Sequence, residues 1–251
     1  MKAILYIGHG TRSKEGAREA VQFLERVIEQ VNVPIQEISF LELSEPSISD
    51  GFNRCIQQGA TNILIVPLFL FAAGHIKKDI PEVLHPLLEE YLDVQISLTD
   101  PFGVQESILD AMAEMVMESV PDLSYQDSIL IVGRGSSDSI IHQNFASITK
   151  GIAKRLKAKD IQVCYLAAAK PSFQTGIERV SKERKGRIIV IPYLLFAGQL
   201  LSEVKREVHI RQKQGEKITL VNTLSHHQTI MDLVVKTCSK KIRRKHAATY
   251  Y

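Results

Sequence analysis

The stretch AILYIGHGT at residues 3–11 returns 125 residues later as SILIVGRGS at residues 128–136. Each copy is an apolar run of strand length that ends in Gly-X-Gly. At the same offset, ILIVP at residues 63–67 matches IIVIP at residues 188–192. One offset held over more than 60 residues indicates an internal duplication.

Each half of the chain reads as alternating strands and helices. In the first half, the expected strands lie at residues 3–7, 35–43, 63–71 and 94–98, and the expected helices at residues 14–31, 48–58, 79–91 and 106–120. Continuous apolar strands flanked by helices indicate a parallel sheet covered on both faces. The sequence predicts an α/β protein of two duplicated domains, residues 1–122 and 123–251, each with a four-stranded parallel sheet and with a cleft between them.

The composition is that of an ordinary globular protein. Of 251 residues, 45% are hydrophobic and 24% charged, which excludes a disordered or fibrous chain. The longest apolar run has 12 residues, too few for a membrane span, and the N-terminus lacks the features of a signal peptide. The three cysteines are too few and too scattered for a disulfide framework, so we expect a cytoplasmic protein.

The two halves differ in charge. Residues 1–125 carry 8 basic and 19 acidic side chains, whereas residues 126–251 carry 23 basic and 9 acidic ones. The basic half is compatible with a nucleic-acid partner, with a solvated surface, or with a polyanionic small molecule held between unlike halves. Basic tracts with few aromatic residues weigh against the nucleic acid.

Three potential metal ligands follow three predicted strands. His9 follows the first strand, Glu42 the second and His75 the third. Because the carboxyl ends of parallel strands share one edge of the sheet, we expect these side chains near one rim. Two imidazoles and a carboxylate suit a divalent transition metal, and the glycines beside His9 allow a ligand to approach the backbone closely. The alternative for each histidine is a hydrogen-bonded loop residue.

The duplication helps to decide between metal ligands and hydrogen-bonded loop residues. At the 125-residue offset, His9, Glu42 and His75 fall on Arg134, Ala167 and Leu200. The scaffold persists while the three metal-competent residues change together, which a structural role does not predict. The first half is therefore expected to hold the reactive group.

Other motifs are less specific. Gly8-His9-Gly10 is neither a dinucleotide fingerprint nor a phosphate-binding loop. Arg134 and Ser136 lie in a Gly-rich loop that either binds an anion at a helix start or forms a plain turn. Lys77 and Lys78 are candidate contacts for substrate carboxylates or else exposed helix-start residues. His226 and His227, which follow the last apolar strand, are read as a polar loop.

Taken together, GHGTR at residues 8–12, LELSEPSI at 41–48 and PLFLFAAGHIKKDIP at 67–81 resemble the signature stretches of the class II tetrapyrrole chelatases, specifically the sirohydrochlorin chelatases. The resemblance covers nearly the whole chain. It implies two α/β domains with a central cleft, metal binding by His9 and His75 with help from Glu42, and one active site per chain. No prosthetic group is implied, and a monomer is expected because the two halves supply the cleft.

The implied reaction is insertion of Fe²⁺ into sirohydrochlorin, with loss of two ring protons. Imidazoles suit loose metal binding and proton transfer, and Glu42 offsets metal charge. The macrocycle is rich in carboxylates, so a basic half, Arg134, Lys77 and Lys78 are expected to attract it. Nitrogen and oxygen ligands bind Co²⁺ or Ni²⁺ at least as well as Fe²⁺, which keeps a cobaltochelatase open.

Two further hypotheses remain. One is a phosphohydrolase with His9 as nucleophile, although such a site calls for an arginine where Gly8 stands. The other is a non-catalytic carrier of metal or tetrapyrrole, which predicts stoichiometric binding without turnover.

Overall fold

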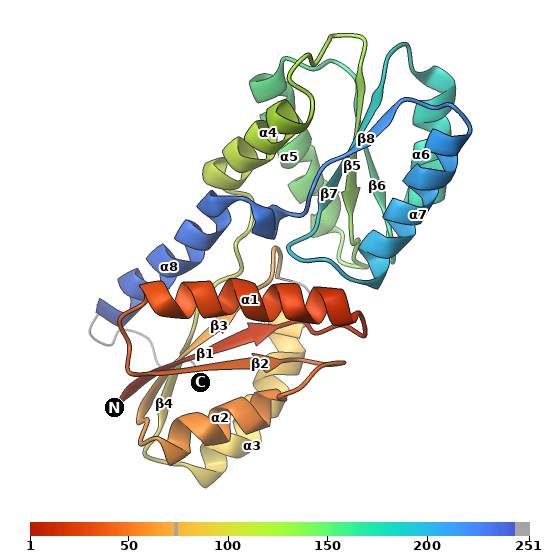
Figure 1. The fold of residues 1–251 in the computed structure, drawn as a ribbon. Helices are drawn as coiled ribbons and strands as arrows, with labels where there is room; N and C mark the ends of the chain where they lie inside the picture. The colour runs from red at the N-terminus through yellow and green to blue at the C-terminus, as the bar shows by residue number, and fades with distance from the viewer. Residues whose placement is uncertain (73–74, 244–251) are drawn as a thin grey trace. The chain divides into compact units, whose positions relative to one another are not determined.

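The chain folds into two compact α/β units, shown in the computed structural model of Figure 1. Unit 1 comprises Met1–Gly103 together with the C-terminal helix from Met231 on, and unit 2 comprises Val104–Ile230. The structure describes residues 1–72 and 75–243, apart from the side chains of His75, Lys77 and Arg243.

Unit 1 is built on a parallel sheet of four strands in the order β2-β1-β3-β4. The strands are β1 (Lys2–Gly8), β2 (Ile35–Phe40), β3 (Asn62–Pro67) and β4 (Gln95–Leu98). The helices are α1 (Lys14–Gln30), α2 (Ile48–Gln57), α3 (Ile80–Glu90) and α8 (Gln228–Arg243), with a π-helical turn η1 (His75–Asp79) before α3. In Figure 1, α1 and α8 cover one face of the sheet, and α2 and α3 cover the other.

The two central strands are buried on both faces, as their continuous apolar runs predict. Every residue of β1 after Lys2 is buried, and so is every residue of β3 after Asn62. The helices between them begin at side-chain caps: Ser13 accepts from the N–H of Gly16 at α1, and Ser47 forms a capping box with Asp50 at α2. These caps fix where the chain leaves each strand end and enters the next helix.

Two predicted strands end earlier than expected. The strand expected at residues 35–43 ends at Phe40, because Leu43 adopts a positive φ of 60° that no strand accommodates. The strand expected at residues 63–71 ends at Pro67, which has no N–H for the ladder. The predicted helix at 79–91 begins at Ile80, after the turn η1. Each early end leaves a longer loop at the carboxyl edge of the sheet.

Unit 2 repeats the same sheet in the order β6-β5-β7-β8. Its strands are β5 (Ser128–Gly133), β6 (Ile161–Tyr165), β7 (Ile188–Tyr193) and β8 (Ile218–Leu220). Its helices are α4 (Glu106–Ser119), α5 (Ile140–Leu156), α6 (Phe173–Glu183) and α7 (Gln199–Lys213), with a 3₁₀ turn η2 (Leu224–His226). The predicted class, two four-stranded parallel sheets flanked by helices, is confirmed.

The strand pairing follows the 125-residue offset. Ala3 pairs with Ile63 in unit 1, and their counterparts Ser128 and Ile188 pair in unit 2. The helices keep the offset too, since the buried positions 16, 20, 23 and 27 of α1 correspond to the buried positions 141, 145, 148 and 152 of α5. The offset breaks before the last strand, where Ile96 corresponds to Ile218. Strand pairing and helix burial thus keep the 125-residue offset through the first two-thirds of each half.

The compact units are not the two halves of the sequence. Helix α4, from the first half, packs on α5 in unit 2. Helix α8, from the second half, packs in unit 1, where Met231 contacts Gln30 and the Cys238 Sγ lies 4.0 Å from the Tyr6 hydroxyl. The predicted boundary at residues 122 and 123 stays a prediction for the duplicated sequences, whereas the folded units have exchanged their last helices.

The cysteines form no framework, as expected. Cys55, Cys164 and Cys238 are all free and buried. Burial raises the pKa of the Cys55 and Cys164 thiols to about 12, so neither is a reactive thiolate near neutral pH. No described helix combines the length and apolar character needed to cross a membrane.

A buried carboxylate holds the chain at the entrance of β5. Asp127, 5% exposed, accepts hydrogen bonds from the N–H of Ser124 and from the N–H and guanidinium of Arg187. Burial pushes the pKa of Asp127 up, but these hydrogen bonds outweigh it and the net shift is downward. A carboxylate with a lowered folded-state pKa adds stability above its unfolded pKa of about 4 and loses it as pH falls through the folded value.

We therefore expect Asp127→Asn to lower the free energy of unfolding at pH 7 by about 2–4 kcal/mol, because it leaves Arg187 without its buried partner. The variant should also lose part of the stability decline that the wild type shows below about pH 4. Urea unfolding at pH 7 and pH 3 measures both effects. An equal loss at the two pH values would contradict the assignment.

Candidate functional site

The carboxyl edge of the unit 1 sheet gathers three loops. Strand β1 lies between β2 and β3, and the chain passes from β1 to β2 on one side and then crosses to β3 on the other. Such a reversal opens a crevice at the carboxyl ends of the strands. His9 follows β1, Glu42 follows β2 and the turn η1 follows β3.

His9 and Glu42 lie side by side, as predicted. The His9 Nδ1 is 3.5 Å from the Glu42 Oε1, and the two side chains are 29% and 47% exposed. The backbone joins their loops, because the N–H of Glu42 donates to the carbonyl of His9 at 3.1 Å. The His9 ring also faces Phe69, with centroids 5.9 Å apart. An imidazole and a carboxylate are thus held together and open to solvent.

The glycines beside His9 let two neighbouring loops pack closely. A Cβ at Gly10, whose φ is +88°, would lie 1.6 Å from the carbonyl oxygen of Glu42, and a Cβ at Gly8 would meet the ring of Phe40 at 2.9 Å. The glycines therefore permit the close approach of the loop that bears Glu42. Gly135 meets the carbonyl of Ala167 in the same way in unit 2, so this is a scaffold feature common to both copies.

The third predicted ligand is only partly described. The backbone of His75 begins η1 after β3, on the side of β1 opposite to β2. The side chains of His75 and Lys77 lie outside the described residues. Lys78 is described: it is exposed, and its Nζ lies 3.9 Å from Glu82. Among the described side chains, no group of three or more His, Cys, Asp or Glu residues gathers to hold a metal.

The corresponding edge of unit 2 has the scaffold without the pair. The N–H of Ala167 donates to the carbonyl of Arg134 at 2.7 Å, matching the Glu42–His9 bond. Arg134 is exposed, while the Ser136 hydroxyl accepts from the N–H of Asp138 at 3.1 Å. Helix α5 begins at Ile140, after the loop that carries Arg134 and Ser136, and anion binding by this loop stays a prediction.

His226 and His227, which follow the last strand, make contacts within unit 2. The His226 Nδ1 lies 3.0 Å from the buried Thr223 hydroxyl. His227 is 13% exposed, and its Nε2 lies 3.0 Å from Glu114 on α4. His227 thereby joins α4 to the segment that follows β8 within unit 2. The sequence had no signal for this contact, because the exchange itself cannot be read from helix patterns.

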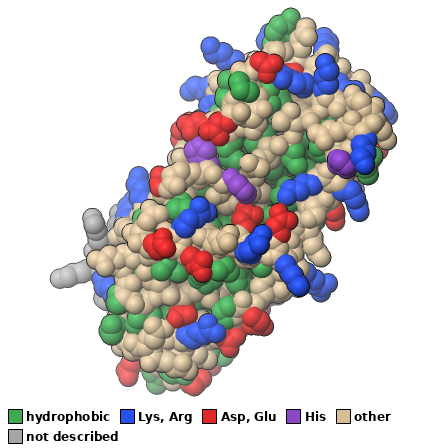
Figure 2. Space-filling model, in the orientation of Figure 1, with side chains coloured by type: hydrophobic (Ala, Val, Ile, Leu, Met, Phe, Trp, Pro, Cys, Tyr) green, Lys and Arg blue, Asp and Glu red, His purple; other side chains and the backbone are tan. Residues whose placement is uncertain are grey.

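The charge imbalance between the sequence halves does not form a single basic patch on the face drawn in Figure 2. On the face drawn in Figure 2, basic and acidic side chains are interspersed over both units. Part of the reason is intramolecular pairing in unit 2, where Arg155 contacts Glu106 and Asp110 from the acidic half of the sequence. This face offers no continuous basic track of the kind that nucleic-acid binding uses.

Fold and site together define a class: a duplicated α/β protein in which one copy alone carries a histidine–carboxylate pair at the switch point of its parallel sheet. The chain belongs to the CbiX family, whose sequence model matches residues 3–119 and again residues 128–241. The two matches confirm the internal repeat, and the membership confirms the resemblance to the chelatases.

Relatives of both metal specificities are similar to this chain. It is 40% identical to the sirohydrochlorin ferrochelatase of Priestia megaterium over 93% of this chain and 88% of that protein. The sirohydrochlorin cobaltochelatase of the same organism is 28% identical, over 87% of this chain and 72% of that one. A solved structure of SirB from Bacillus subtilis with Fe³⁺ matches with a TM-score of 0.83 and 33% identity, over 96% of each chain.

Proposed function

We propose that the protein is a sirohydrochlorin ferrochelatase, a lyase that inserts Fe²⁺ into sirohydrochlorin to form siroheme and releases two protons. The observation that carries the proposal is the exposed His9–Glu42 pair, which unit 1 has and unit 2 lacks. The higher identity to a ferrochelatase than to a cobaltochelatase of one organism favours iron.

The geometry of the pair suits a divalent ion. Two ligand atoms about 2.1 Å from a tetrahedral ion lie roughly 3.4 Å apart. The separation of 3.5 Å between the His9 Nδ1 and the Glu42 Oε1 is close to that value. The Nδ1 also lies 3.3 Å from the carbonyl oxygen of Gly10, so it must give up that contact and its proton to bind a metal. We propose His75, which begins η1 at the same edge of the sheet, as the third ligand.

The same side chains serve proton removal. A free-base macrocycle gives up two N–H protons as the metal enters, and the ligand set is vacated in that step. His9 and Glu42 then have lone pairs available, and an imidazole is basic enough to accept a proton near neutral pH. Loose binding by mixed nitrogen and oxygen ligands favours release of iron to the ring.

We further propose Lys77, Lys78, Arg134 and Ser136 as contacts for the carboxylates of the macrocycle. Lys78 and Arg134 are exposed, each in its own unit, and a surface pair such as Lys78–Glu82 costs little to break. The proposal includes a monomeric, cytoplasmic enzyme, and sedimentation of the purified protein tests the first of these.

Anaerobic metallation tests the reaction. With Fe²⁺ we expect each protein molecule to metallate many molecules of sirohydrochlorin. The absorption change of the macrocycle measures this turnover. With Co²⁺ under matched conditions we expect slower turnover. A faster cobalt reaction would move the assignment to a cobaltochelatase. Stoichiometric uptake without turnover would favour a carrier, and no acceleration over the uncatalysed reaction would exclude a chelatase.

A further inference from the structure

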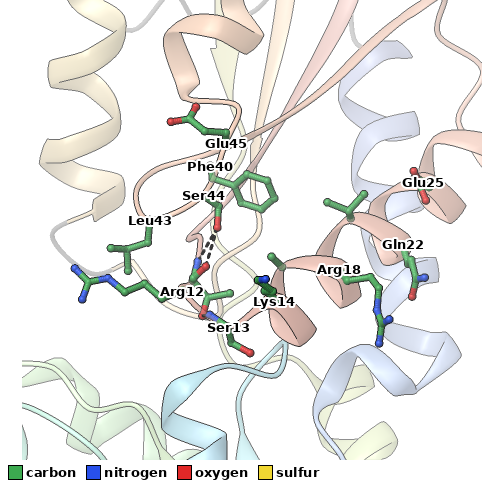
Figure 3. A pocket seen from close by; sticks show the side chains of 13 residues that line it. Arg12, Ser13, Lys14, Arg18, Gln22, Glu25, Phe40, Leu43, Ser44 and Glu45 are labelled. Carbon is green, nitrogen blue, oxygen red and sulfur yellow. Dashed lines mark hydrogen bonds between the residues drawn. The ribbon is translucent and has the colours of Figure 1, made fainter.

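A groove of about 580 Å³ opens on unit 1 between the start of α1 and the loop that follows β2. Figure 3 shows the side chains that line this groove. Arg12 precedes α1, Lys14 is the first residue of α1, and Arg18 lies one turn further along the helix. The buried ring of Phe40 and the exposed Leu43 supply apolar lining. The groove is of a size that takes part of a ligand with a charged edge and an apolar body.

The three cations of this groove have no side-chain partner among the described residues. Across residues 1–72 and 75–243, the side chains of Arg12, Lys14 and Arg18 make no hydrogen bond or ion pair with another described residue. Two carboxylates also line the groove, Glu25 further along α1 and Glu45 beyond Leu43. Three unpaired cations within seven residues repel one another, so an anion stabilises them.

The groove adjoins the loops that carry His9 and Glu42. Thr11 and Ser44 lie on its lining and bind each other twice: the Ser44 hydroxyl accepts from the N–H of Thr11 and donates to the carbonyl of Thr11, both at 3.0 Å. Thr11 is two residues after His9, and Ser44 is two residues after Glu42. Whatever occupies the groove therefore sits on the same two loops as the metal-competent pair.

The duplication supplies an independent observation. Strand pairing and helix burial keep the 125-residue offset through α1 and α5. At that offset, Arg12, Lys14 and Arg18 fall on Ser137, Ser139 and Gln143. The second half is the basic one, yet it lacks all three cations where it also lacks His9 and Glu42. The three cations are thus confined to the copy that carries His9 and Glu42.

We infer that this groove binds carboxylates of the macrocycle and thereby holds the ring for metal insertion at His9 and Glu42. The inference rests on the proposed function and adds a binding site in the acidic half of the chain. Arginine receives a carboxylate through two parallel N–H donors, and Lys14 adds a third cation to the lining of the groove. The groove cations bind and position the ring, whereas His9 and Glu42 on the neighbouring loops carry out metal insertion.

The test replaces the groove cations by the residues of the second copy, in the triple variant Arg12→Ser, Lys14→Ser and Arg18→Gln. The same backbone already carries those residues in unit 2, so the fold is expected to persist. We expect the Kd for metal-free sirohydrochlorin, measured by absorbance titration, to rise about 10- to 100-fold. The KM should rise similarly with kcat changed less than about threefold, and the affinity should depend less on salt.

A matched pair of single variants controls for lost charge. Arg18→Gln should weaken ring binding, whereas Arg26→Gln, on the same helix but outside the groove, should not. An ester analogue without free carboxylates should bind wild type and triple variant equally. Unchanged Kd in the triple variant, or equal effects of Arg18→Gln and Arg26→Gln, would overturn the inference. Ring binding that depends on the groove without any turnover would instead overturn the chelatase proposal and leave the groove standing.

Discussion

His9→Ala is expected to slow iron insertion by on the order of 10²- to 10⁴-fold, the largest effect of any single substitution proposed for this protein. The imidazole is placed both to hold the metal and to accept a ring proton, so its loss removes two functions at once. Glu42 remains 47% exposed in water and does not replace it. Because the groove lies apart from the imidazole, the Kd for metal-free sirohydrochlorin should stay within about threefold of the wild type.

Two measurements separate chemistry from folding. Binding of Co²⁺ in the absence of macrocycle, followed by its visible absorption, should weaken in His9→Ala while the melting temperature stays close to that of the wild type. His85→Ala is the matched control, because His85 is an exposed histidine of unit 1 paired only with Glu89 in the next turn of α3. Normal turnover in His9→Ala, or equal loss in His85→Ala, is the result that would sink the metal-site proposal.

The sequence predicts the sheets well because their signal is local. Apolar runs of strand length at the two ends of a constant offset define β1, β3, β5 and β7. Strand ends were less predictable. The departure of Leu43 from the ladder depends on its positive φ, which follows from the neighbouring loop and not from leucine itself.

The exchange of α4 and α8 could not be predicted from either helix. An amphipathic pattern shows which face is buried but not which sheet covers it. Both helices follow the fourth strand of their own half, and each packs in the other unit. The contacts that decide this, such as His227 with Glu114, join residues far apart in sequence.

The site was half predictable for a related reason. His9 and Glu42 were found because strand ends of a parallel sheet meet at one edge. The proposed role of Arg12, Lys14 and Arg18 could not be predicted, because cations at a helix start are usually solvated and their grouping appears only with the groove. The signal was nonetheless present: the comparison that separates His9 from Arg134 also separates Arg18 from Gln143.

Gly10→Ala is expected to have the second largest effect, by damaging the scaffold of the site. A Cβ would lie 1.6 Å from the carbonyl oxygen of Glu42, and Gly10 has a φ of +88° that alanine rarely adopts. Backbone strain alone costs about 1–3 kcal/mol, and the clash adds to it, so the loop bearing Glu42 must move. We expect a lower melting temperature and loss of both Co²⁺ binding and turnover at a temperature where the variant is folded.

The duplication provides the control for this prediction. Gly135 has a φ of +89°, and a Cβ there would lie 1.8 Å from the carbonyl oxygen of Ala167, so Gly135→Ala imposes nearly the same distortion on unit 2. Both variants should lose similar thermal stability, at about 2–4 °C per kcal/mol for a chain of this size. Only Gly10→Ala should lose Co²⁺ binding, because only that distortion separates an imidazole from a carboxylate. If the two variants bound Co²⁺ equally, Gly10 would be needed for the fold and not for metal binding. That result would contradict the proposal that His9 and Glu42 form the metal site.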